Sequence, residues 1–259
     1  MFIGNHFLEI LIFAWGLCIG SFLNVCIFRL PEDQSIVRPR SSCPQCKNPI
    51  RFYDNIPIIS YLLLRGRCRH CGKKIALRYP LVELLTGLFA LGTFLKFGPT
   101  WDSLIYFVFI AALLTITFID LDHRIIPDVI TLPGLLIFAA SSLVLSDITL
   151  IDSIIGVVVG GGSLLTVAWI YKMLTHKDGM GGGDIKLLAM IGAVVGWQGV
   201  LLTIFVASAT GTLAGILTML KARQGNLKLA IPFGPFLATG ALVYIFWGQS
   251  LIYWYIYTF

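Results

Sequence analysis

The sequence predicts an all-α membrane protein with about eight transmembrane helices and a cysteine-rich loop between the first two. Of its 259 residues, 57% are hydrophobic and only 12% are charged, and the mean hydropathy is +0.87. A soluble protein cannot bury so large an apolar fraction. Long apolar stretches alternate with short polar breaks, and two C-x2-C pairs lie in the most basic of those breaks. The composition therefore excludes an ordinary soluble globular domain.

The expected spans are the apolar stretches that approach the length needed to cross the hydrocarbon core. The first carries Glu9 and has no basic leading segment, so we do not interpret it as a cleaved signal peptide. The sixth is short, and its boundary with the seventh falls between Gly196 and Gly199. The eight spans are predicted at residues 7–28, 81–97, 103–120, 129–146, 153–171, 185–199, 200–220 and 231–250.

The loop between the first two spans indicates the orientation of the chain. Between Arg29 and Arg78 lie eleven of the 19 Lys and Arg residues but only three acidic residues, so this loop carries a net charge of +8. The positive-inside rule places such a loop in the cytoplasm. Eight alternating spans then put both termini outside, and put Asp120 and Asp184 on the cytoplasmic side. Anionic lipid headgroups are the expected partners of the basic charge, and we expect no nucleic acid to bind.

Four cysteines in this loop have the spacing of a zinc site. Cys43, Cys46, Cys68 and Cys71 form two C-x2-C units separated by 21 residues, slightly more than is usual in a zinc ribbon. Four thiolates complete a tetrahedral structural site for zinc. Two disulfides are the alternative, but a reducing cytoplasm disfavours them. The sequence thus predicts three domains: a first helix at 1–28, a zinc-binding domain at 29–80, and a seven-helix membrane domain at 81–259.

Two aspartates stand out at the ends of apolar spans. Asp184 follows Gly181, Gly182 and Gly183 at the start of a span, and Asp120 lies at the end of another. Acidic residues within membrane segments are candidates for function because burying them is costly. Consecutive glycines allow an extended substrate backbone to approach the carboxylate closely. A pair of carboxylates that shares one proton can activate water for peptide hydrolysis and titrates as a coupled unit.

Each of these aspartates also has a simpler interpretation. Asp184 could cap the following helix, with Lys186 as its local partner. Asp122 is an alternative to Asp120 as the first carboxylate. Asp128 follows Pro127 and could cap the fourth span.

Several motifs, in order along the chain, resemble one known family. The Asp120 site lies seven residues before Pro127, and Gly181-Gly182-Gly183-Asp184 fits a GxGD pattern. Together with these motifs, the chain resembles the type IV prepilin peptidases, which are bifunctional leader peptidases and N-methyltransferases of bacterial pilus, type II secretion and competence systems. The other matching segments are 20–25 with 29–31, the four cysteines with 55–57, 78–84, and 231–236.

The resemblance implies an activity that the residue spacing does not reveal by itself. The substrates would be prepilins or pseudopilins, cut after a glycine at the cytoplasmic face by Asp120 and Asp184. The new N-terminal amine would then be methylated from S-adenosylmethionine. The protein would be a multi-pass protein of the bacterial inner membrane.

The resemblance also implies that Gly66, Arg67 and Glu83 lie near the methyl donor, although the sequence has no G-x-G-x-x-G motif of the Rossmann type. Arg67 could instead contact lipid, and Glu83 could pair with Arg78. A proton-coupled transporter that uses the same two aspartates is the alternative function.

Overall fold

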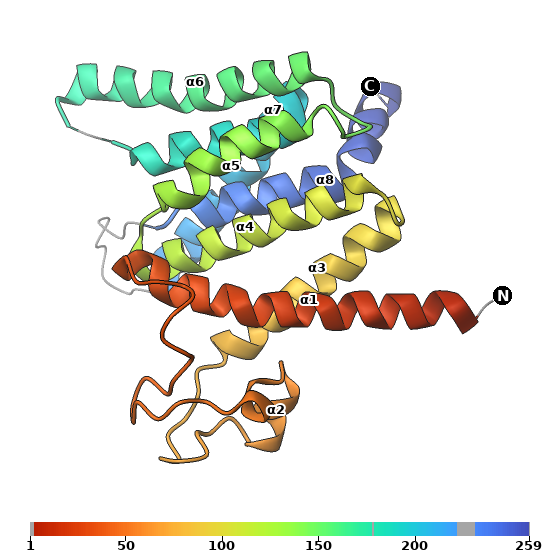
Figure 1. The fold of residues 1–259 in the computed structure, drawn as a ribbon. Helices are drawn as coiled ribbons and strands as arrows, with labels where there is room; N and C mark the ends of the chain where they lie inside the picture. The colour runs from red at the N-terminus through yellow and green to blue at the C-terminus, as the bar shows by residue number, and fades with distance from the viewer. Residues whose placement is uncertain (1–2, 178, 222–230, 259) are drawn as a thin grey trace. The chain divides into compact units, whose positions relative to one another are not determined.

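The computed structural model describes residues 3–177, 179–221 and 231–258, and these residues are mostly helical (Figure 1). In the described part of the chain, extended pairing is limited to two isolated β-bridges, both in the cysteine loop. The all-α prediction is confirmed. The elements are α1 (Ile3–Arg29), η1 (Leu30–Glu32), η2 (Phe52–Asn55), α2 (Ile59–Leu63), α3 (Arg78–Phe97), α4 (Trp101–His123), α5 (Asp128–Ser141), α6 (Leu150–Thr175), α7 (Gly182–Lys221) and α8 (Gly234–Thr258).

Six of these helices are long and apolar enough to cross a membrane, which makes the chain a multi-pass membrane protein. The difference from the eight predicted spans has two causes. Helix α5 has only 14 residues, about 21 Å at 1.5 Å per residue, which is below the usual length of a membrane-spanning helix. The predicted sixth and seventh spans both lie within α7, which consists of two helical segments joined by a kink at Gly196, where φ is 66°. The predicted boundary is therefore present as a kink.

The chain forms two compact units, Met1–Thr115 and Ile116–Phe259. In the first, α1 and α3 pack closely through small residues. A Cβ added to Gly16 would lie 2.6 Å from the Ala90 Cβ, and one added to Gly20 would lie 2.6 Å from the Glu83 Cα. This Gly-x3-Gly spacing allows backbones to approach in lipid, where hydrophobic burial provides no drive between helices.

In the second unit, α7 is the central helix and packs against α5, α6 and α8. Its contact with α6 is a backbone contact, because a Cβ on Gly156 would overlap the carbonyl oxygen of Gly192, and one on Gly192 would overlap that of Gly156. The hydroxyl of Ser153 donates to the Ala193 carbonyl at 2.7 Å across the same interface. Close packing around α7 fixes the helix that carries Asp184.

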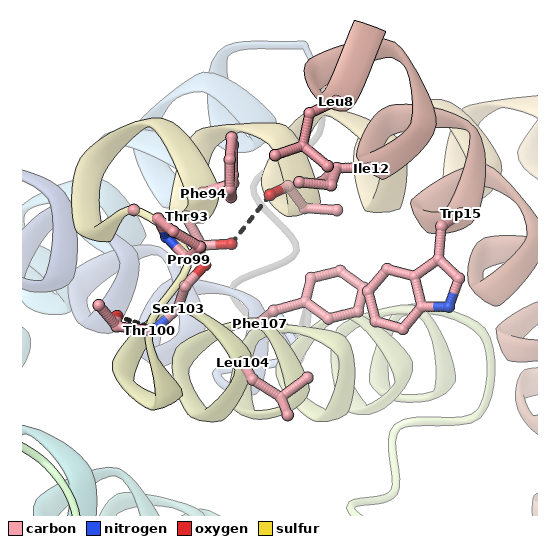
Figure 2. Close-up of a pocket in the computed structure, with 12 residues that line it drawn as sticks. Leu8, Ile12, Trp15, Thr93, Phe94, Pro99, Thr100, Ser103, Leu104 and Phe107 are labelled. Carbon is pink, nitrogen blue, oxygen red and sulfur yellow. Dashed lines mark hydrogen bonds between the residues drawn. The ribbon is translucent and has the colours of Figure 1, made fainter. Parts of the chain in front are cut away.

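A cavity of about 250 Å³ lies in the first unit between α1, α3 and the start of α4 (Figure 2). Its walls are mainly apolar, with Trp15 and Phe107 in ring contact at 4.9 Å between centroids. Its hydroxyl groups are engaged locally: Thr93 donates to the Ala90 carbonyl, and Thr100 accepts from the Ser103 amide. The motif residues of the candidate sites do not line it.

Candidate active site and metal centre

Asp120 lies in the last turn of α4 and is held at the start of α8. Arg124, in the left-handed region at φ 58°, closes the helix by donating its N–H to the Asp120 carbonyl at 2.9 Å. The Asp120 side chain is only 4% exposed. Its Oδ2 accepts the backbone N–H of Gly234, the first residue of α8, at 3.0 Å. The unpaired N–H groups at a helix N-terminus stabilise an acidic side chain there.

Asp184 is the third residue of α7, and its side chain is half-buried. The Asp184 and Asp120 carboxylates are close enough for their charges to interact. A Cβ added to Gly181 would lie 3.7 Å from Asp184 Oδ2, which shows that the carboxylate faces the glycine run. Gly181 and Gly182 are exposed. The structure therefore places a carboxylate beside accessible backbone that has no side chains.

Ile126, in the loop after α4, brings the two carboxylate-bearing regions together. A Cβ added to Gly183 would lie 2.8 Å from the Ile126 Cβ, and one added to Gly234 would lie 3.5 Å from its Cδ1. The same side chain therefore packs against the first turns of both α7 and α8. This packing explains the glycine at position 183, because a larger residue there would displace Ile126, whereas the contact of Ile126 with Gly234 is an ordinary van der Waals contact.

The alternative roles of the nearby acidic residues do not match the geometry. Helix α7 begins before Asp184, so Asp184 is not its N-cap, and Lys186 pairs instead with Asp128 at 2.7 Å. Asp128 lies inside the first turn of α5, whose N-cap is Pro127 without a side-chain cap. Asp122 is exposed, whereas Asp120 is buried.

The two C-x2-C units form equivalent knuckles. In the first, the Cys43 N–H donates to the Asn48 carbonyl, and the Lys47 N–H returns to the Cys43 carbonyl, both at 2.9 Å. In the second knuckle, the Cys68 N–H donates to the Lys73 carbonyl, and the Gly72 N–H donates to the Cys68 carbonyl, both at 2.9 Å. The residue after each second cysteine has a positive φ, 59° at Lys47 and 69° at Gly72.

The four thiols are gathered at one point. Their sulfur atoms all lie within 4.8 Å of one another. The Sγ atoms of Cys43 and Cys71 are 3.9 Å apart, and those of Cys46 and Cys68 are 4.0 Å apart. Four thiolates about 2.3 Å from a tetrahedral metal ion are separated by about 3.8 Å, so the cluster could hold a metal ion.

The two thiols of the second knuckle differ in acidity. Backbone N–H groups of Cys71 and then His70 lower the pKa of the Cys68 thiol to about 7, whereas burial and the hydrogen bonds of the other three thiols raise the pKa of Cys71 to about 11. Arg69 makes a bidentate pair with Asp54, with N–O distances of 2.6 and 2.9 Å, and this hydrogen bond lowers the pKa of Asp54. The pair connects the knuckle to η2.

The three candidate residues for methyl-donor binding lie around α2. Gly66 follows that helix at φ 66° and is buried, and a Cβ there would lie 2.8 Å from the Tyr61 hydroxyl oxygen. The Glu83 Oε2 accepts the Ile58 N–H just before α2, at 2.8 Å. Arg67 is exposed. Gly66 and Glu83 thus already have structural contacts, while Arg67 presents a charged side chain to its surroundings.

Sequence reasoning did not identify Gly234 and Ile126 as parts of the site. A Cβ at Gly234 would lie 2.7 Å from Asp120 Oδ2, so a larger residue there would displace the carboxylate from the start of α8. The signal available in the sequence was Gly234-Pro235, since proline commonly begins a helix and the preceding residue then presents its N–H at the helix end. Ile126 gave no comparable signal.

Comparison with known proteins agrees with this arrangement. The model for the bacterial Peptidase A24 N-terminal domain matches residues 14–97, and the model for the type IV leader peptidase family matches residues 107–216. The first match contains all four cysteines, and the second contains both aspartates. No solved structure matches the chain significantly.

The curated relatives cover nearly the whole chain. A protein of Aeromonas hydrophila named prepilin leader peptidase/N-methyltransferase is 39% identical over 96% of this chain and 94% of its own length. A protein of the same name from Pseudomonas putida is 38% identical over 91% of this chain and 89% of its own length. These matches extend from the cysteine loop through both carboxylates to α8, and the chain accordingly belongs to the type IV leader peptidase family.

Proposed function

We propose that this protein cleaves the leader peptides of prepilins or pseudopilins and then N-methylates the new N-terminal residue. The observation that carries the peptidase half is the buried Asp120 carboxylate, fixed by the Gly234 N–H and within electrostatic range of Asp184. The family supplies the substrate class, since its curated members are named prepilin leader peptidase/N-methyltransferase. Neither the site nor the relatives favour a proton-coupled transporter.

The peptidase mechanism follows from the two carboxylates. One ionised carboxylate takes a proton from water, and the protonated carboxyl of the other donates a hydrogen bond to the scissile carbonyl oxygen. The substrate backbone lies against Gly181, Gly182 and Gly183, where no side chain separates it from Asp184. The hydrogen bond from the Gly234 N–H keeps the Asp120 carboxylate in one orientation. The carboxylate therefore needs little reorganisation during the reaction.

The methyl-transfer half requires a methyl donor, which we propose is S-adenosylmethionine bound near Gly66, Arg67 and Glu83. The donor supplies an electrophilic methyl group when it is bound. Arg67 is the candidate for a direct contact, because its exposed guanidinium can bind a carboxylate of the donor. Gly66 and Glu83 shape and anchor the loop that carries it.

Zinc is the metal that we propose for the four cysteines. A four-thiolate, tetrahedral set suits zinc, and a closed set of protein ligands is typical of a structural rather than a catalytic site. The ion would connect the two knuckles of the loop domain at 29–80, while residues 81–259 form the protease domain. We place the loop and both aspartates on the cytoplasmic side of the bacterial inner membrane, with both termini outside.

The aspartate pair is tested by three asparagine variants of nearly unchanged size. Asp120→Asn and Asp184→Asn should each lower prepilin cleavage by about 10²-fold or more, because each removes one member of the acid–base pair. The matched control is Asp122→Asn, whose exposed side chain lies two residues from Asp120 and should leave cleavage intact. Cleavage is measured by the mass shift of a purified prepilin. Normal cleavage by Asp120→Asn together with loss in Asp122→Asn would transfer the role to Asp122.

The zinc site is tested by elemental analysis of protein purified under reducing conditions. We expect about one zinc per chain, and loss of the metal in Cys68→Ser, because three thiolates leave the tetrahedral site incomplete. Cys18→Ala, in α1, is the control and should retain the metal. Metal-free protein of full activity, or disulfide-bonded cysteines after reducing purification, would contradict the assignment.

The two reactions should separate when methylation is assayed on a pre-cut pilin peptide. Asp184→Asn should retain methylation, because amine methylation does not use the peptidase carboxylates. Arg67→Ala should raise the KM for S-adenosylmethionine about tenfold, the cost of one charge-assisted hydrogen bond, with cleavage unchanged. Lys74→Ala removes an exposed charge from the same loop as a control. If Arg67→Ala methylates with an unchanged KM while zinc content is normal, the methyl donor binds elsewhere.

A further inference from the structure

Helix α2 carries an apolar stripe that no neighbouring element of its own unit covers. Its residues Ile59, Leu62 and Leu63 are 55%, 66% and 78% exposed. They are spaced i, i+3 and i+4, so they project from one side of the helix. The opposite side faces the interior of the loop domain, where the hydroxyl of buried Ser60 donates to the Tyr53 carbonyl at 2.9 Å. Helix α2 is therefore amphipathic, with its apolar side outward.

One hydrogen bond fixes the depth of this helix relative to a membrane span. The Ile58 N–H, directly before α2, donates to Glu83 Oε2 at 2.8 Å. Glu83 lies five residues into α3, about 7.5 Å along its axis at 1.5 Å per residue. The 20 residues of α3 extend about 30 Å, the thickness of the hydrocarbon core, so Arg78 marks the membrane boundary. The start of α2 lies beside the first turns of this span.

This depth is that of interfacial helices, which insert an apolar face about 5–10 Å into the boundary between headgroups and acyl chains. The first turn of α3 also has an exposed apolar side chain, since Leu81 is 46% exposed. A lipid-facing stripe on α2 would thus continue the lipid-facing surface of the span beside it.

The charge around α2 selects an anionic lipid surface. Arg65 follows the helix and Arg51 precedes it in the loop, and both side chains are exposed. Long basic side chains extend from an apolar surface to reach headgroups, and each one adds to the attraction toward an anionic leaflet. The loop from Arg29 to Arg78 carries eleven basic and three acidic residues.

We propose that α2 is an interfacial helix, which inserts Ile59, Leu62 and Leu63 into an anionic leaflet and so docks the cysteine domain on the membrane surface. The contact is with lipid rather than with a second protein, because the domain is connected to spans at both ends and one of these spans holds α2 at membrane depth. This inference does not depend on the peptidase or methyltransferase activity.

The test uses the full-length, zinc-loaded protein in lipid nanodiscs that contain phosphatidylglycerol and phosphatidylcholine. A fluorophore is attached to a ketone-bearing amino acid at position 63, which leaves all cysteines in place, and at position 47 as the control. Lys47 is exposed and lies beside the first knuckle. Lipids with a nitroxide on the upper acyl chain should quench position 63 by about half or more, and position 47 far less, as expected for side chains buried at this depth. Discs of phosphatidylcholine alone should give weaker quenching at position 63.

Four results would overturn the proposal. Quenching of position 63 by aqueous iodide and not by lipid nitroxide would show that the stripe faces water. Protection of position 63 from both quenchers would show that protein covers the stripe, either another copy or another part of the chain. Quenching that changes only after addition of a prepilin would identify the substrate as the partner. Equal quenching by lipid nitroxide with and without phosphatidylglycerol would show that the contact does not require anionic headgroups. Normal zinc content of each labelled protein ensures that the domain is folded.

Discussion

The hydrogen bond between the Gly234 N–H and the Asp120 carboxylate is the contact on which the candidate active site depends. It joins the end of α4 to the start of α8, and it satisfies both a buried acid and an unpaired amide at a helix terminus. Ile126 then packs against Gly183 as well as Gly234, which brings the first turn of α7 to the same place. Asp184 enters the site as a consequence of this convergence. Three helix ends, far apart in sequence, therefore meet at one candidate active site.

The cysteine domain uses a different kind of stabilisation. It has few buried apolar residues, and its two knuckles are held by short backbone hydrogen bonds and the Arg69–Asp54 pair. Metal binding in such a small domain contributes directly to folding. The Glu83 carboxylate connects this domain to α3, so a residue predicted to lie near the methyl donor also has a structural task. Loss of methylation in a Glu83 variant would for this reason not identify a donor ligand by itself.

Much of this arrangement could be predicted from the sequence because it depends on local spacing. The C-x2-C units brought four thiols together as expected, and the glycine run placed Asp184 at a helix start. The length of α5 and the close approach of the two segments of α7 at the Gly196 kink depend on packing against neighbouring helices, which hydropathy does not encode. The role of Gly234 was hidden because glycine has no side chain, and only the fold shows that Asp120 occupies the space beside it.

The most direct test of the central contact is the cleavage rate of Gly234→Ala in the full-length protein. The added Cβ would lie 2.7 Å from Asp120 Oδ2 and would displace the carboxylate, and small misplacements of catalytic groups can reduce rates about 10²-fold. Gly215→Ala, in α7, is the control, because its added Cβ would have no atom nearer than 3.9 Å. The account predicts a folded Gly234→Ala protein that has lost cleavage, beside a Gly215→Ala protein of normal activity. Cleavage by Gly234→Ala at the rate of the unaltered protein would contradict it.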